Sequence, residues 1–252
     1  MRVRKLLTLA AVVAAFAAVA SPANAVFYGE PDGNAHPYVG LMVAMDANNT
    51  PLWRCTGTQI SPTVFLTAGH CVFGAAKAMV WFDSGRPAGY PRTGGFVGTP
   101  IPNPGYDEFA TFPNTSDVGV VKFSTPISMP MYGTLTGPNT LDELAKHEIF
   151  DIVGYGLQDV QPVEVAIVQR VKGQVKLVNA KSGASGGYSL HLSNNNGQPH
   201  QGGLCFGDSG GPVLKGSTVY AVNSFVINNN CAGSGYSFRV DLPAINSWIR
   251  SQ

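Results

Sequence analysis

Three stretches of the sequence decide which fold to expect. They are Phe65-Leu66-Thr67-Ala68-Gly69-His70-Cys71, Asp117-Val118-Gly119-Val120-Val121-Lys122-Phe123 and Gly207-Asp208-Ser209-Gly210-Gly211-Pro212. The first ends an apolar run in a histidine beside a cysteine. The second sets an acid immediately before an apolar run, and the third places a serine in a glycine-rich turn.

The three stretches supply a base, an acid and a hydroxyl in the chain order His70, Asp117, Ser209. A serine hydroxyl is a weak nucleophile at neutral pH, so acyl transfer needs an imidazole to take its proton and a carboxylate to orient that imidazole. The glycines around Ser209 allow successive backbone N–H groups to point into one concavity. We expect Gly207 and Ser209 to donate there to a developing oxyanion.

With these motifs the sequence resembles the chymotrypsin/trypsin-like serine protease family. The resemblance extends from Val26 to the end of the chain, and T-A-G-H-C and G-D-S-G-G-P are that family's two most specific motifs. It implies an all-β fold of two six-stranded antiparallel β-barrels with a C-terminal α-helix and an active site between the barrels. His70 and Asp117 would come from the first barrel and Ser209 from the second.

Two alternatives concern residues close to these motifs. Asp107 is the nearest competing acid, but it lies in a proline-rich stretch, 100–113, rather than at the start of a strand.

The four cysteines allow three disulfide connectivities. The resemblance implies the pairs Cys55–Cys71 and Cys205–Cys231. A Cys/His metal site lacks the usual pair of closely spaced cysteines, and we expect no metal and no cofactor.

Composition agrees with an exported β protein. The 252 residues are 44% hydrophobic and 12% charged with a net charge of +1, which argues against disorder, a coiled coil and nucleic acid as the main partner. The 30 glycines and 18 prolines separate short apolar runs. These runs predict strands at 39–45, 63–68, 78–82, 118–123, 149–153, 165–171, 175–178, 212–214 and 219–227, with a helical turn at 141–148.

The first 25 residues read as a signal peptide. A basic start is followed by an apolar run of about 15 residues, which is short for a membrane span of about 20, and then by Ala23-Asn24-Ala25. The alternative is a transmembrane anchor. We therefore expect a secreted, extracellular protease domain at 26–252, with one barrel at about 26–135, the other at about 136–240 and a terminal helix at about 242–252.

The resemblance also assigns an activation pair and a substrate pocket. A new α-amine at Val26 would pair with Asp208, the acid before the serine, although Phe27 and Tyr28 replace the smaller residues usual there. We expect cleavage of the leader itself to expose this amine. The residues expected to contact substrate are Gly203, Leu204, Ser224, Phe225, Val226 and Gly235. No carboxylate is among them, and Val226 replaces a glycine, so small or medium apolar side chains are expected before the scissile bond rather than Lys or Arg.

The partners implied are protein or peptide substrates and protein protease inhibitors, with no nucleic acid, no membrane and a monomeric state. Two other functions remain open. One is a catalytically silent homologue that acts as a binding protein, and the other is an esterase of small acyl substrates. The intact His70, Asp117 and Ser209 favour an endopeptidase, because silent relatives usually lose one of the three.

Overall fold

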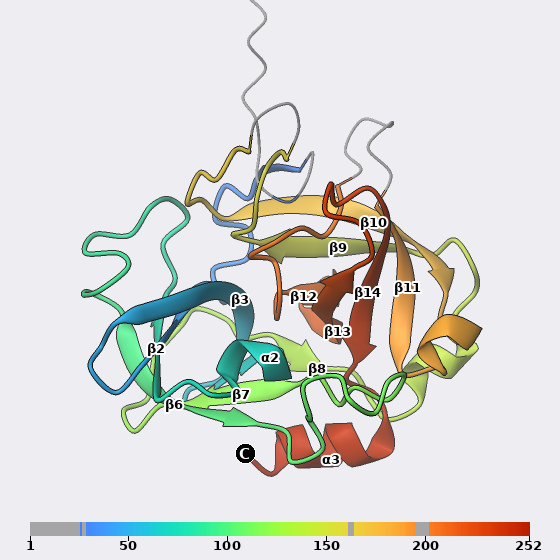
Figure 1. Ribbon diagram of the computed structural model, residues 1–252, viewed down its shortest axis with the longest axis horizontal. Coiled ribbons are helices and arrows are strands. Elements are labelled where there is room, and N and C mark those ends of the chain that lie inside the picture. The colour runs from blue at the N-terminus through green and yellow to red at the C-terminus, as the bar shows by residue number, and fades with distance from the viewer. Residues whose placement is uncertain (1–25, 27–28, 161–163, 195–201) are drawn as a thin grey trace, which may run out of the picture.

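A computed structural model describes residues 26, 29–160, 164–194 and 202–252. Residues 1–25, where the signal peptide is predicted, and most of the Asn/Gly-rich segment before Gly202 lie outside them. The described chain forms two closed six-stranded antiparallel β-barrels side by side, followed by a terminal helix (Figure 1). No helix in these ranges is long and apolar enough to cross a lipid bilayer.

The first barrel closes in the order β2-β3-β4-β7-β6-β5. Its strands are β2 (Val39–Met45), β3 (Pro51–Ser61), β4 (Val64–Thr67), β5 (Lys77–Trp81), β6 (Phe96–Pro102) and β7 (Gly119–Lys122). The short helix α2 (Gly69–Val72) follows β4 directly. The barrel therefore delivers the residues after β4 and before β7 to the same place, because β4 and β7 are antiparallel neighbours.

The second barrel runs β9-β10-β11-β14-β13-β12, and β9 pairs with both β10 and β12 to close it. Its strands are β9 (Ile149–Gly154), β10 (Val171–Asn179), β11 (Ser189–Asn194), β12 (Pro212–Lys215), β13 (Thr218–Val226) and β14 (Gly233–Arg239). Two short strands join this sheet from outside, β1 (Glu30–Pro31) on β10 and β8 (Thr134–Leu135) parallel to β13. Single helical turns lie at η1 (Thr140–Glu143) and η2 (Gly183–Ser185).

One apolar core joins the two barrels to each other and to α3 (Pro243–Arg250). Leu66 and Val120 of the first barrel pack in the same cluster as Phe238 of the second, and Ile245 and Ile249 of α3 complete it. Pro243 at the first helical position fits the start of a helix, where its missing N–H has no intrahelical partner. The barrels are thus fixed to one another, which fixes the geometry of any site between them.

The structure contains strands that the sequence did not predict, among them β3, β11 and β14, and two further departures have a local explanation. The proline-rich stretch begins inside β6, whose residues 96–98 pair with β5 while 99–102 pair only with β7. Pro100 and Pro102 therefore lie where one side of the strand has no partner, a position that tolerates the missing N–H. Of the strand expected at 165–171, only Val171 lies in a strand, as the first residue of β10. Val165 makes only an isolated bridge to Asp159.

Arg170, just before β10, is a fully buried cation that links three parts of the molecule. Its guanidinium bonds the Asp32 carboxylate at 3.0 Å, the backbone oxygens of Val39 and Phe82 in the first barrel, and the Tyr155 hydroxyl. Removing one partner of a buried ion pair leaves the other charge uncompensated.

We expect Arg170→Met to lower the free energy of unfolding by about 3 kcal/mol, because buried Asp32 would lose its guanidinium partner, although it would keep its contacts with His36, and the Val39 and Phe82 carbonyls would lose their donor. Denaturant unfolding measures the loss. The matched control is Lys172→Met, which removes a solvent-exposed pair with Glu30 at 3.4 Å and should cost less than about 1 kcal/mol. Equal losses in the two variants would contradict the structural role of Arg170.

Candidate active site

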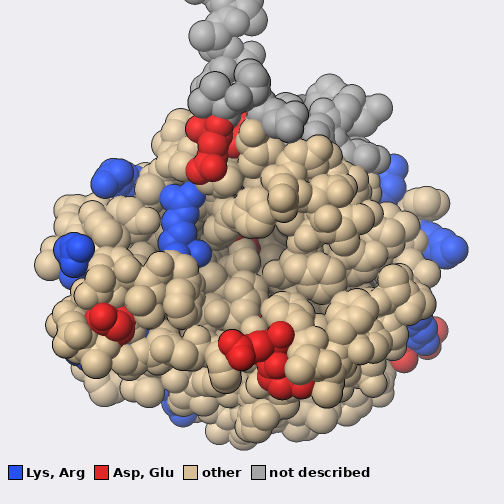
Figure 2. All heavy atoms as spheres, viewed as in Figure 1, with Lys and Arg blue, Asp and Glu red and all other residues tan. Residues whose placement is uncertain are grey.

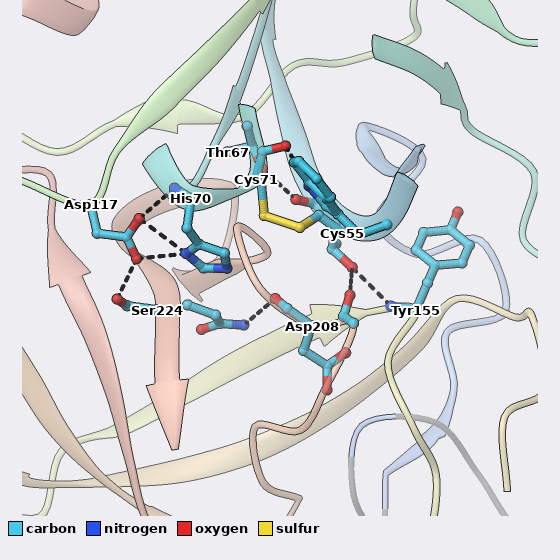
Figure 3. The surroundings of a disulfide bond; sticks show 12 residues. Cys55, Thr67, His70, Cys71, Asp117, Tyr155, Asp208 and Ser224 are labelled. Atoms are coloured by element: carbon cyan, nitrogen blue, oxygen red, sulfur yellow. Dashed lines mark hydrogen bonds and ion pairs between the residues drawn. A yellow bond between two sulfur atoms is a disulfide. The ribbon is translucent and has the colours of Figure 1, made fainter. Parts of the chain in front are cut away.

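His70 lies in α2, where the chain leaves β4, and its side chain turns toward Asp117 (Figure 3). The imidazole Nδ1 lies 2.9 Å from Oδ2 of Asp117, and the His70 backbone N–H donates to Oδ1 at 2.8 Å. Gly69 makes this approach possible, because a Cβ there would lie 2.9 Å from the Tyr106 ring and 3.2 Å from the Asp117 carboxylate. The side chain of His70 remains 25% exposed, whereas that of Asp117 is fully buried.

Asp117, two residues before β7, is held from two sides. Besides the contacts from His70, the Ser224 hydroxyl of β13 donates to Oδ2, and Figure 3 shows His70 and Ser224 both pointing at this carboxylate. Burial alone would raise the pKa of Asp117, but the charge of His70 and the hydrogen bonds from His70 and Ser224 outweigh it, and the pKa lies below 3.8. Asp117 is therefore a carboxylate at neutral pH.

The same contact sets the pKa of His70. Burial alone would lower that pKa, but the Asp117 carboxylate and its hydrogen bond stabilise the protonated ring and raise the pKa of His70 above 6.5. Asp117 also favours a proton on Nδ1, which leaves Nε2 as the free acceptor in the neutral ring. The ring can thus accept a proton from a neighbouring hydroxyl at Nε2.

The loop that carries Ser209 is pressed against the first barrel. A Cβ on Gly210 would lie 2.0 Å from Oγ1 of Thr67 and 2.5 Å from the Thr56 carbonyl, and Gly210 has a φ of +77°. Only glycine fits this position. The Thr56 backbone N–H donates to the Ser209 carbonyl at 2.8 Å, and the Thr56 hydroxyl donates to the Gly207 carbonyl. Strand β3 therefore holds this loop beside the end of β4.

These contacts bring Ser209 and His70 to the wall of one cavity. The cavity holds about 310 Å³, and in Figure 2 the middle of this face is hollowed between the barrels and bordered mostly by uncharged atoms. The described residues show no hydrogen bond between the Ser209 hydroxyl and the His70 ring. The backbone N–H groups of Gly207 and Ser209, the expected oxyanion donors, likewise have no hydrogen-bond acceptor within the described part of the chain.

Asp208 is buried beneath this loop. Burial raises the pKa of its carboxyl to about 7, although the backbone N–H groups of Gly156 and Cys205 donate to it at 2.8 and 3.1 Å. Val26, its expected partner, is buried in the core of the second barrel. In this chain the Val26 nitrogen is still bonded to residue 25 and is not an amine, and no ion pair with Asp208 is present among the described residues. Phe27 and Tyr28 lie outside those residues.

The expected substrate-contacting residues divide into two groups. Leu204, Ser224, Phe225 and Val226 line the cavity, whereas Gly203 and Gly235 do not. Phe109, Phe206 and Asn223, which the sequence did not predict, also line the cavity. Phe109 comes from the proline-rich stretch and contacts both the His70 ring and the Phe225 ring. Its only sequence signal is its place in the loop that precedes Asp117.

Both disulfides implied by the resemblance are present. Cys55 joins Cys71 beside His70, and Cys205 joins Cys231 at the wall of the cavity. Cys55, His70 and Cys71 lie close enough together to suggest a metal site by distance alone. Because the two sulfurs are bonded to each other, they are not the thiolates that bind zinc. Asp107, the competing acid, accepts a hydrogen bond from the Thr111 hydroxyl and not from His70.

The family described as Trypsin matches residues 30–249 of this sequence. The chain belongs to the trypsin family. The structure of HL collagenase is similar to this trypsin-family chain with a TM-score of 0.72 at 18% identity, and the match covers 90% of this chain and 97% of the collagenase. Human heparin binding protein is similar with a TM-score of 0.69 at 15% identity, over 90% and 96% of the two chains. At these identities the likeness concerns the fold. No curated protein matches the sequence.

Proposed function

We propose that this trypsin-family chain is a secreted serine endopeptidase that hydrolyses peptide bonds through Ser209, His70 and Asp117. The observation that carries the proposal is the Asp117–His70 pair at 2.9 Å beside a cavity that Ser209 also lines. Trypsin-like proteases act on proteins and peptides, and we expect the same substrate class here, with protein inhibitors as further partners and a monomer as the active form.

The proposed reaction has two acyl-transfer steps. His70 Nε2 takes the proton of the Ser209 hydroxyl while Oγ bonds to the substrate carbonyl carbon, and the N–H groups of Gly207 and Ser209 donate to the oxyanion. The imidazolium then returns the proton to the leaving amine as the C–N bond breaks. Water repeats the sequence on the acyl-enzyme and releases the acid. Asp117 stays ionised throughout and stabilises the imidazolium.

Activation would follow leader removal. Cleavage after Ala25 would convert the Val26 nitrogen into an amine, and Val26 already lies in the core of the barrel that carries Asp208. An ammonium group beside Asp208 would compensate a buried carboxylate whose hydrogen-bond donors within the described ranges are the backbone N–H groups of Gly156 and Cys205, and whose pKa is raised to about 7. N-terminal sequencing of the secreted, active protein should begin at Val26. Any other first residue would contradict activation by leader removal alone.

The pH dependence of activity follows from His70. The ring can act as a base only when neutral, and its pKa lies above 6.5. As pH falls through that pKa, the fraction of neutral His70 falls, so kcat/KM should decline with a midpoint above pH 6.5 and level off at higher pH. A pH profile of kcat/KM measures the midpoint. A midpoint below 6.5 would contradict the stabilisation of the imidazolium by Asp117.

A binding protein without catalysis is the second candidate. One solved structure with the same fold is named for heparin binding, so the fold also serves a protein named for a binding function. An esterase of small acyl groups is a further variant. Strand β13 favours peptides, because Phe225 and Val226 pair with β14 while the pairing with β12 ends at Val222, so the other edge of the strand could pair with an extended substrate chain.

A fluorophosphonate probe tests the proposed function directly, since it bonds covalently to an activated serine. We expect one label per secreted protein, located by mass spectrometry on the peptide that contains Ser209. Hydrolysis of a denatured protein would then separate the endopeptidase from the esterase. A folded, leader-free protein that takes up no label would favour the binding protein.

A further inference from the structure

One pocket of the site should accept the side chain of the substrate residue before the scissile bond. The inner end of this pocket, its floor, is closed. Gly203 and Gly235 were expected to line this pocket, and both are buried away from the cavity. A substrate side chain that enters the cavity therefore cannot reach either glycine. Something else must fill the space between them.

Leu204 fills part of that space. A Cβ built on Gly235 would lie only 2.5 Å from Cδ1 of Leu204, and the leucine is 3% exposed. Its side chain packs in the apolar core of the second barrel, against Val226 at the cavity wall. Leu204 is thus both a core residue and the surface on which the cavity ends.

Asn194, the last residue of β11, fills the rest. A Cβ on Gly203 would lie 3.0 Å from Cβ of Asn194, and a Cβ on Gly235 would lie 2.8 Å from its Oδ1. The Asn194 amide is completely buried and makes three hydrogen bonds. Nδ2 donates to the carbonyl oxygens of Leu204 and Cys231, both at 3.0 Å, and Oδ1 accepts the Leu204 N–H at 3.2 Å.

These three hydrogen bonds fix the floor in place. The Asn194 amide bonds both the backbone N–H and the backbone carbonyl of Leu204. It also bonds the carbonyl of Cys231, which is the disulfide partner of Cys205, the residue after Leu204. With both amide protons and the oxygen engaged, Asn194 has little left to offer a polar substrate group. Moving the Leu204 backbone would break these buried hydrogen bonds, and the Leu204 side chain is held by packing in the core of the second barrel, so the pocket should not deepen when a large side chain binds.

We infer that Leu204, positioned by Asn194, closes the primary specificity pocket, so that the residue before the scissile bond can be no larger than valine. This inference rests on the proposed function and narrows it from small or medium apolar residues to glycine, alanine and valine. Phenylalanine, leucine, lysine and arginine side chains would collide with Leu204. Phe109, Phe206 and Phe225 line the same cavity as Leu204.

A series of peptide boronic acids tests the inference on the unmodified protein. The compounds share one peptide and differ only in the last residue, which is alanine, valine, phenylalanine or arginine. Since one methylene in an apolar pocket changes binding about 10–200-fold, we expect alanine and valine compounds to inhibit at least about 100-fold more strongly than the other two. Equal inhibition by the phenylalanine or arginine compound would overturn the inference.

The variant Leu204→Ala should open the floor and reduce the preference for alanine over phenylalanine at least about tenfold. The matched control is Leu190→Ala, a fully buried leucine on β11 that does not line the cavity. It should lose comparable stability and keep the original selectivity. Unchanged selectivity in a folded Leu204→Ala protein would overturn the inference, and if that variant does not fold, the wild-type series decides.

Fluorophosphonate labelling separates the two proposals. A labelled wild-type protein with the wrong boronate preference refutes the closed pocket and leaves the protease proposal intact. A wild-type protein without label refutes the protease proposal, and the closed pocket falls with it.

Discussion

The variant Ser209→Ala is expected to lower kcat for peptide hydrolysis by about 10⁶-fold, because without the hydroxyl no acyl-enzyme can form. The loop should keep its shape, since its anchoring contacts use the Ser209 carbonyl and the Thr56 side chain rather than the Ser209 hydroxyl. Hydrolysis of a fluorogenic peptide by the leader-free protein measures the effect. Fluorophosphonate labelling should disappear in parallel.

Ser217→Ala is the matched control. Ser217 lies in the turn between β12 and β13, in the same barrel, and does not line the cavity. Its removal should leave both hydrolysis and labelling within about twofold, as is usual for surface substitutions. A Ser209→Ala protein that still hydrolyses peptides at the wild-type rate would refute Ser209 as the nucleophile.

The variant Asp117→Asn should lower kcat by about 10⁴-fold with little change in KM. An asparagine NH₂ facing Nδ1 would favour the tautomer with its proton on Nε2, so the ring could no longer accept a proton from Ser209. The raised pKa of His70 depends on the Asp117 carboxylate. In Asp117→Asn the midpoint of the pH profile of kcat/KM should therefore also move to lower pH. Steady-state kinetics across pH measures both effects.

Asp107→Asn provides the control for this variant, because Asp107 is the other acid near the site in sequence. Its carboxylate bonds only Thr111 among the described residues, so kcat should stay near the wild-type value. Circular dichroism should show that both variants are folded. A loss of 10⁴-fold in Asp107→Asn, with Asp117→Asn active, would reverse the assignment of the two acids.

The sequence predicted the architecture through its motifs and its turn-rich pattern, and the Trypsin match and the two barrels confirm it. The expected strand at 39–45 coincides with β2, and the apolar residues of the terminal helix pack on the core as expected. The pattern of apolar residues did not predict strands β11 and β14, whose sequences are rich in serine and glycine. Their pairing comes from neighbouring strands, which supply the ladder and the buried face that the segments themselves do not signal.

The site was predictable where one residue type is required and unpredictable where only packing decides. His70, Asp117 and the glycines around Ser209 stand in local motifs, because proton transfer and the tight turn each demand particular side chains. Gly203 and Gly235 were expected in the pocket wall, and the structure places them behind Leu204 and Asn194. No sequence pattern around Asn194 predicts the three hydrogen bonds that its side-chain amide makes.

The sequence by itself therefore determined the family, the barrel fold and the residues with which the proposed chemistry would be carried out. Tertiary structure alone decided which side chains border the cavity and where that cavity ends. The physical reason is that a motif encodes chemistry and backbone conformation within a few residues. The shape of a pocket depends on the volumes of side chains such as Leu204 and Phe109, which folding brings together from distant parts of the chain.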